Sequence, residues 1–307
     1  MKGEALVIAA GQGETIEQVS RRLKKEQRSL TRRRVLGHYG LLAGAIVFGV
    51  LLLAALLGPV ITAYGPYDMK ITERLTAPGA AHLLGTDEFG RDLLTRILYG
   101  ARVSLGVGLT VAVLSSLAGL VIGVYAAYYK TLDHILMRIC DGLIAIPGIL
   151  LAIALMAALG ASALNVITAL TIVFTPGIAR IVRSSALVVR EQPYIEAMTV
   201  QGAGATRIIW LHIVPNTLSP LIVQATFVFA EAIIAEAALS FLGAGVPAPE
   251  ASWGNILQAG KLVIFKAWWM VAFPGAAIVL SVLSLNLLGD GLRDLLDPRL
   301  KGKGRKV

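Results

Sequence analysis

The chain has 307 residues, of which 56% are hydrophobic and only 15% are charged, and its mean hydropathy is +0.73. A soluble domain carries roughly 25% charged residues, so this composition excludes an ordinary soluble protein and indicates an integral membrane protein. The net charge is +9, and the single cysteine, Cys140, excludes an internal disulfide and a multi-cysteine metal site.

Six apolar stretches are long enough to cross a bilayer, whose hydrocarbon core requires about 20 residues of helix. In chain order they are Leu41–Tyr64, Val103–Tyr128, Gly142–Leu159, Leu164–Ile181, Leu218–Leu242 and Trp268–Leu288. Because these stretches are continuously apolar and do not alternate with polar positions, they favour helices over a transmembrane β-barrel. We therefore expect an all-α integral membrane fold with six transmembrane helices.

The distribution of basic residues predicts the orientation of these helices, because Lys and Arg are retained on the cytoplasmic side of a membrane. An even number of spans places both termini on one side, and that side then holds 21 of the 28 Lys and Arg residues. Both termini are therefore expected in the cytoplasm. The net positive charge is explained by this topology, and we expect contact with membrane lipid and none with nucleic acid.

The predicted organisation has five parts. They are a basic cytoplasmic tail (1–38), a first transmembrane helix (39–64), an extracytoplasmic segment (65–100), a membrane core (101–290) and a cytoplasmic tail (291–307). The first tail contains a candidate amphipathic stretch at Ile16–Leu30, and the membrane core contains a long cytoplasmic loop (190–215). The polar segment before the first span is too long for a secretory signal peptide, so that span is expected to stay in the membrane.

The extracytoplasmic segment contains a run rich in glycine and carboxylate, from Gly85 to Asp92. An EF-hand calcium loop needs acidic residues at positions 1, 3 and 5 and a glutamate at position 12, and this run does not fit that spacing. We predict a structural turn that leads into a helix, with Asp92 near the helix start, where the helix dipole favours an anion.

The loop 190–215 is predicted to form two short helices with a break between them. Pro193 suits the first turn of a helix, Glu196 lies near its positive end, and Gly202 and Gly204 can end it with a positive φ. A second helix is expected from about Ala205 to His212, and it must stop before Pro215.

Helices this short are marginal in water, so the loop must pack on another surface. Small residues of the loop allow a second backbone to approach closely; they are Ala197, Gly202, Ala203, Gly204 and Ala205. Larger apolar residues offer anchors for that second surface; they are Tyr194, Ile195, Met198 and Ile208. That surface is either a partner protein or the membrane domain of the same chain, and the loop composition leaves both open. A DNA-binding helix-turn-helix is excluded because both ends of the loop are tied to membrane spans.

The loop resembles the EAA motif of ABC importer permeases, in which Glu-Ala-Ala, a glycine and a final Ile-x-Leu-Pro form the helices that couple to an ATPase. Glu196, Ala197, Gly202 and Pro215 stand at motif positions. Met198 replaces the second alanine, and His212 and Val214 replace the isoleucine and the leucine.

The resemblance extends over about 82–299 and is specifically to the dipeptide, oligopeptide and nickel group of these permeases, second-permease type. The stretches that carry it are Leu84–Asp87 with Gly90–Asp92, Tyr99–Leu105, Ala235–Gly243, Ser252–Asn255, and Asn286–Asp294 with Asp297–Arg299.

This resemblance implies a type I ABC importer permease in a prokaryotic cell (inner) membrane, which carries di- or oligopeptides or, alternatively, nickel or another small solute. It implies a second permease subunit, two ATPase subunits and an extracytoplasmic solute-binding protein as partners. The chain has no G-x-x-x-x-G-K-[ST] phosphate loop, so ATP and Mg²⁺ are expected on the ATPase subunits and no cofactor or metal in this chain.

Acidic residues within the fifth predicted span leave an ion-coupled secondary transporter as a rival interpretation. Glu231 and Glu236 are separated by about 140° around a helix, so they do not form one dyad, and each is expected to face protein or water. Together with Ser240 and Asn286 they are the candidate pathway or gate residues. An enzyme is not expected, because no H-E-x-x-H or G-x-S-x-G motif occurs.

Overall fold

The long apolar stretches of the chain form long helices. The computed structural model describes residues 37–296, and within that range all regular secondary structure is helical apart from an isolated antiparallel bridge between Thr86 and Asp92. In chain order the elements are α3 (Tyr39–Ile61), η1 (Ile71–Glu73), α4 (Leu93–Tyr128), α5 (Lys130–Ile144), α6 (Gly148–Leu159), α7 (Ala163–Arg190), α8 (Pro193–Val200), α9 (Ala205–Ile208), η2 (Ile209–Ile213), α10 (Val214–Phe241), α11 (Trp253–Val263) and α12 (Trp269–Leu296).

The predicted all-α membrane fold is confirmed. In the described range, five helical stretches are long and apolar enough to cross a membrane: α3, α4, α7, the run Ala205–Phe241 and α12. The bent pair α5 and α6 makes a sixth span if it is counted as one. The tail 1–38, including Ile16–Leu30, lies outside the described residues except for its last two, and the described part of the tail 291–307 belongs to α12.

The third predicted span, Gly142–Leu159, is wrong as a single helix. α5 ends at Ile144 and α6 begins at Gly148, with an angle of 92° between them. Pro147 lies at this break, and a proline has no N–H to donate and disfavours helical backbone at the residue before it, here Ile146. The continuous apolar window therefore contains a sharp bend between two helices.

Several helices continue beyond the windows predicted for them. α4 begins at Leu93 because the carboxylate of Asp92 caps it and accepts a hydrogen bond of 2.8 Å from the backbone N–H of Thr95, which confirms the predicted role of Asp92. α7 extends to Arg190, because a charged side chain ends an apolar window without ending a helix. α11 was not predicted; it begins with a capping box between Ser252 and Asn255.

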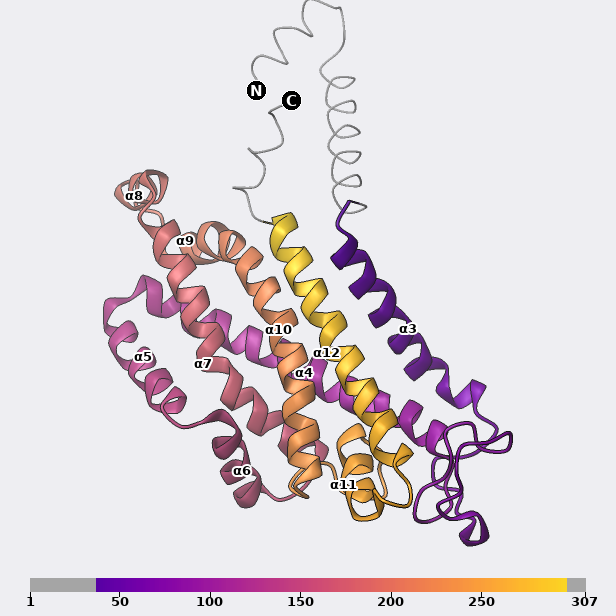
Figure 1. Ribbon diagram of the computed structural model, residues 1–307. Coiled ribbons are helices and arrows are strands. Elements are labelled where there is room, and N and C mark those ends of the chain that lie inside the picture. The colour runs from indigo at the N-terminus through magenta and orange to yellow at the C-terminus, as the bar shows by residue number, and fades with distance from the viewer. Residues whose placement is uncertain (1–36, 297–307) are drawn as a thin grey trace, which may run out of the picture.

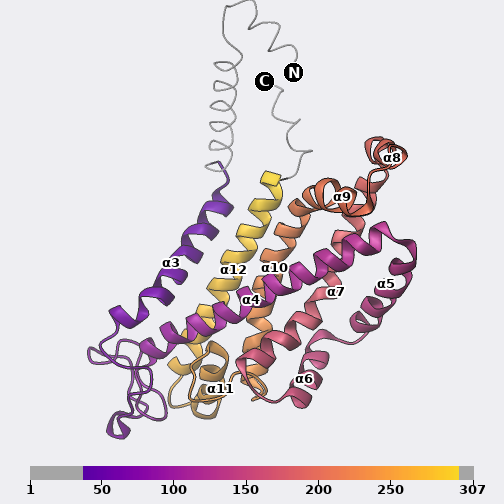
Figure 2. The ribbon, with the colours of Figure 1, turned by 180° about the vertical axis from the view of Figure 1, so that it is seen from behind.

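Helix α4 is the element around which the others pack. It crosses the bundle obliquely, behind α7, α10 and α12 in Figure 1 and in front of them in Figure 2, and it contacts all three as well as α3, α5 and α11. A β-carbon at Gly123 would lie 2.6 Å from the carbonyl oxygen of Ala179 on α7. Small residues on α4 thus let α7 approach its backbone, as is typical of helix pairs in membranes.

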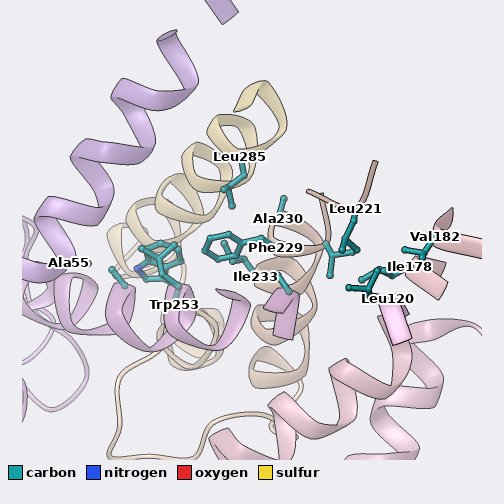
Figure 3. Packing of buried hydrophobic residues seen from close by; sticks show 14 of the residues in the cluster. Ala55, Leu120, Ile178, Val182, Leu221, Phe229, Ala230, Ile233, Trp253 and Leu285 are labelled. Atoms are coloured by element: carbon teal, nitrogen blue, oxygen red, sulfur yellow. The ribbon is translucent and has the colours of Figure 1, made fainter. Parts of the chain in front are cut away.

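The hydrophobic core joins helices that are far apart in the sequence. The labelled core residues in Figure 3 come from α3, α4, α7, α10, α11 and α12 and include Phe229 and Ile233 of α10, Trp253 of α11 and Leu285 of α12. Outside this core, α3 exposes large apolar residues such as Val50 and Leu53, which suits contact with lipid.

The segment between α3 and α4 is held by buried polar contacts. The imidazole of His82 lies 2.9 Å from a carboxylate oxygen of Asp92 and 3.0 Å from one of Glu73. Burial lowers the pKa of His82, but the hydrogen bonds to these two carboxylates outweigh it and raise the pKa above its usual value. Asp87 accepts hydrogen bonds from Arg91 and from the backbone N–H of Phe89. These contacts make the run a structural turn, as predicted.

The two ends of the bundle differ. The start of α3, the end of α12, and α8 and α9 lie at one end, whereas the segment before α4 and α11 lie at the other (Figures 1 and 2). At the first end His38, which precedes α3, lies 3.2 Å from the carboxylate of Asp294 on α12.

The close approach of α4 and α7 predicts that adding one methyl group between them lowers the stability of the protein. Gly123→Ala places a β-carbon against α7, so the free energy of unfolding falls by about 1–3 kcal/mol. Gly106→Ala, on the same helix but with nothing within 4 Å of its β-carbon, is neutral or raises the stability by up to about 1 kcal/mol. Thermal unfolding in detergent measures both variants, and equal shifts would contradict this packing.

Candidate functional site

Helix α8 is the first helix of the loop 190–215. Pro193 occupies its first turn, as predicted, and Glu196 lies in the same turn. The helix ends at Val200, and Gly202 has a φ of +83°, which confirms the positive φ predicted for that glycine. Gly204 was predicted to share this conformation, but its φ is −67° and it is the residue that precedes α9.

Part of the loop packs against its own chain. Ile195 is only 3% exposed, Ile208 is fully buried, and Met198 and Ala203 pack against the same core. The loop composition left open whether Ile195, Met198 and Ile208 anchor a partner protein or pack on their own chain. In the structure they fix the loop on the end of the bundle, because a helix of this length needs such contacts to form.

The opposite side of the loop is uncovered. Tyr194 is 45% exposed and Val200 is 83% exposed, and Glu196 and Ala197 are also exposed. A β-carbon at Gly202 or at Gly204 would meet nothing within 4 Å, while Ala205 is half-buried. Figure 1 shows α8 projecting beyond the other helices of the bundle. The loop thus presents a surface of one aromatic ring and several small residues.

The prediction that the second helix of the loop stops before Pro215 is wrong. α9 passes through a π-helical segment, Ile209–Ile213, directly into α10, whose first turn contains Pro215. The backbone N–H of Val214 bonds to the carbonyl of Ile209, five residues back, and this wider turn accommodates a proline without interrupting the helix. The loop is therefore connected to α10 without a flexible joint.

A buried carboxylate lies where α4, α10 and the start of α11 meet. Glu236 of α10 is 0% exposed and accepts hydrogen bonds of 2.9 Å from Ser104 of α4 and 2.8 Å from Ser240. The two serine hydroxyls accept in turn from backbone N–H groups, Ser104 from Trp253 and Ser240 from Val246. Glu236 thus joins α4 and α10 to the start of α11 and to the loop before it.

The other candidate pathway residues are not part of this network. Glu231 is exposed on α10, and Asn286 is half-buried on α12. Within residues 37–296, no group of three or more His, Cys, Asp and Glu residues could hold a metal ion. Glu231 and Glu236 consequently do not form one ion-binding site.

The hydroxyl of Ser104 and the backbone of Trp253 are members of the network that sequence reasoning missed. Ser104 is 132 residues from Glu236 in the sequence, so no local pattern connects the two. The only signals were their positions within two of the family-like stretches, Tyr99–Leu105 and Ser252–Asn255.

Comparisons with known proteins agree with this architecture. Residues 119–302 match the family described as the binding-protein-dependent transport system inner membrane component, and residues 27–78 match the N-terminal transmembrane domain of oligopeptide transport permease C.

Two curated relatives are similar over most of their length. A putative peptide transport system permease protein of Brucella abortus biovar 1 (strain 9-941) is 54% identical over 275 residues, which cover 90% of this chain and 93% of the relative. The dipeptide transport system permease protein of Escherichia coli (strain K12) is 45% identical over 270 residues, which cover 85% and 90%.

Among solved structures, a chain of the MetNI methionine ABC transporter in inward-facing conformations has a TM-score of 0.56 at 20% identity. The match covers 66% of this chain and 97% of that chain. At this identity the match shows the fold alone.

The Glu236 network predicts different effects for the two acidic residues of α10. Glu236→Ala leaves two buried hydroxyls without their acceptor and creates a cavity, so it lowers the free energy of unfolding by about 3 kcal/mol or more. Glu231→Ala removes an exposed side chain of the same type and changes it by about 0.5 kcal/mol or less. Thermal unfolding in detergent compares them, and the network would be irrelevant to stability if the two shifts were the same.

Proposed function

The chain belongs to the family of binding-protein-dependent transport system inner membrane components, and from that premise we propose that it forms half of the translocation pathway of an ATP-driven importer of di- and oligopeptides. The relatives that carry the names of peptide and dipeptide permeases, at 41–54% identity, support a peptide over nickel as the solute. The chain is a transport subunit and not an enzyme.

The proposed assembly contains a second permease subunit, two ATPase subunits and an extracytoplasmic solute-binding protein. ATP and Mg²⁺ bind to the ATPase subunits. Both termini and α8 face the cytoplasm, and the segment between α3 and α4 faces the binding protein. The excess of Lys and Arg in the two tails and in the loops that the sequence predicts to be cytoplasmic supports this orientation.

The uncovered side of α8 is the proposed docking surface for an ATPase subunit. Its exposed Tyr194 and Val200 offer apolar contacts, and the open space around Gly202 and Gly204 lets a partner backbone approach. The exposure of α8 at the tip of the bundle is the observation that carries this proposal, because an eight-residue helix with one buried residue gains little from its own chain.

Movement of α8 would be transmitted to the membrane through both of its connections. α7 ends two residues before α8 begins, and α9 continues through the π-helical segment into α10. Closure of the ATPases would then shift α7 and α10 together and change the access of the pathway. Such coupling requires that α7 and α10 have two alternative arrangements. ATP and solute would each shift the equilibrium between these two arrangements.

The test compares two glycines that both have a positive φ. Gly202 and Gly160 both have a positive φ, +83° and +87°, and a β-carbon at either meets nothing within 4 Å. Gly202→Asp places a side chain and a charge on the proposed docking surface. Gly160→Asp adds the same side chain at the far end of the bundle, at a φ of +87° and a ψ of 163° that only glycine adopts readily, so this control is strained as well. We expect Gly202→Asp to reduce the ATPase recovered with the permease from native membranes by about tenfold or more.

The Gly160→Asp variant should recover the ATPase subunits as the wild type does. Equal recovery with both variants would contradict docking on α8. A wild-type chain that purifies alone and transports on an ion gradient would contradict the importer itself.

A further inference from the structure

Helix α5 has two opposite faces of different polarity. One face carries the polar side chains Asp133, His134, Arg138 and Asp141, and the other carries exposed apolar side chains, Leu132, Ile135 and Ile139. The apolar face suits lipid. The polar face is turned toward α7, as its contacts with that helix show.

Two arginines of α7 meet the carboxylates of α5. Arg183 forms a two-pronged contact with Asp133, in which Nε and Nη2 donate to separate carboxylate oxygens, the second at 2.6 Å. Arg180 donates from Nη2 to Asp141 at 2.7 Å. The first pair is half-buried, whereas the side chains of Arg180 and Asp141 are 53% and 59% exposed.

These charges lie within α5 and α7 and not in the loops that follow them. Arg180 is ten residues before the end of α7, which is about 15 Å along the helix, and Asp141 is eight residues beyond Asp133, about 12 Å. Charged side chains on helices of a membrane protein face the interior of a bundle or water, because contact with lipid is costly. The polar face of α5 therefore borders water or protein.

A groove of about 390 Å³ opens between α5 and α7, and all the charged residues described above line it. Arg138 also lines it and, within residues 37–296, has no carboxylate partner at ion-pair distance. The groove thus offers guanidinium groups and carboxylates side by side in a volume that suits a small ligand.

We propose that the Asp141–Arg180 pair, with Arg138, forms a transient binding site for the charged groups of a short peptide, its termini and its charged side chains, on its way through this half of the pathway. A guanidinium matches the geometry of a carboxylate, and a carboxylate of α5 matches an ammonium group. An exposed ion pair is weak, so a zwitterion can replace each partner at little cost. The half-buried Asp133–Arg183 pair holds the two helices together. This inference rests on the proposed import of peptides.

The test uses the assembled transporter in proteoliposomes, with its binding protein and ATPase subunits, and measures uptake of labelled dipeptides together with ATP hydrolysis. We expect Arg180→Gln and Arg138→Gln to reduce uptake of a dipeptide with an acidic side chain by about tenfold, and uptake of one with a basic side chain less. Asp141→Asn should show the reverse preference. ATP hydrolysis stimulated by the loaded binding protein should persist.

The matched control is Asp290→Asn, which removes the same charge from an exposed carboxylate of α12 outside the groove and should leave uptake unchanged. Arg138→Gln breaks no ion pair of the described residues, so it tests the groove without removing a described ion pair between α5 and α7. If the wild type takes up peptide, the proposed function is upheld. If uptake is then unchanged in all three groove variants, the inference about the groove is overturned. Loss of the second permease subunit from the variants would make the groove a subunit contact and overturn it as well. No peptide uptake by the wild type would overturn the proposed function itself.

Discussion

A charged or polar group within a membrane span must be met by protein or by water, and this constraint accounts for the unusual parts of the fold. Glu236 is fully buried near the α11 end of α10 and is tolerated because two serine hydroxyls donate to it. The same hydroxyls accept from the backbone N–H groups of Val246 and Trp253, which belong to the loop before α11 and to its first turn. One carboxylate thereby fixes four segments that no local sequence pattern brings together.

The two ends of the bundle differ in how far their polar groups are bonded within the chain. Between α3 and α4, His82 and Asp87 are buried and bonded within the chain, and Trp269 of α12 donates to the carbonyl of Thr86. At the other end, α8 keeps most of its surface exposed. The helix before α8 is α7, which carries Arg180, and the long helix after it is α10, which carries Glu236. In the proposed mechanism, the ATPase surface and both polar sites therefore share the same moving elements.

The sequence predicted the features that depend on local chemistry. Continuous apolar windows located the spans, the carboxylate of Asp92 marked the start of α4, and Pro193 and Gly202 marked the two ends of α8. It did not predict the bend at Pro147, because hydropathy averages over a break in the helix. It also ended the second helix of the loop too early, because a π-helical turn before Pro215 is not visible in a pattern with the α-helical period.

The features that depend on long-range contacts could not be predicted. Ile195, Met198 and Ile208 look alike as anchors in the sequence, and only packing decides that they face their own chain. Arg180 and Arg183 read as charges that flank a span, yet α7 continues past them and places them opposite the carboxylates of α5. The pairing of Glu236 with Ser104 likewise depends on how α4 crosses α10.

The orientation and exposure of α8 are the central claim of this account, and cysteine labelling tests them directly. Val200→Cys, in a Cys140→Ala background, places one reactive thiol on the exposed side of α8. A membrane-impermeant maleimide should label it in inside-out vesicles stripped of ATPase subunits, should not label it in intact cells, and should be blocked when the ATPase subunits are added back. Labelling from outside the cell, or labelling that the ATPase subunits do not change, would contradict the account.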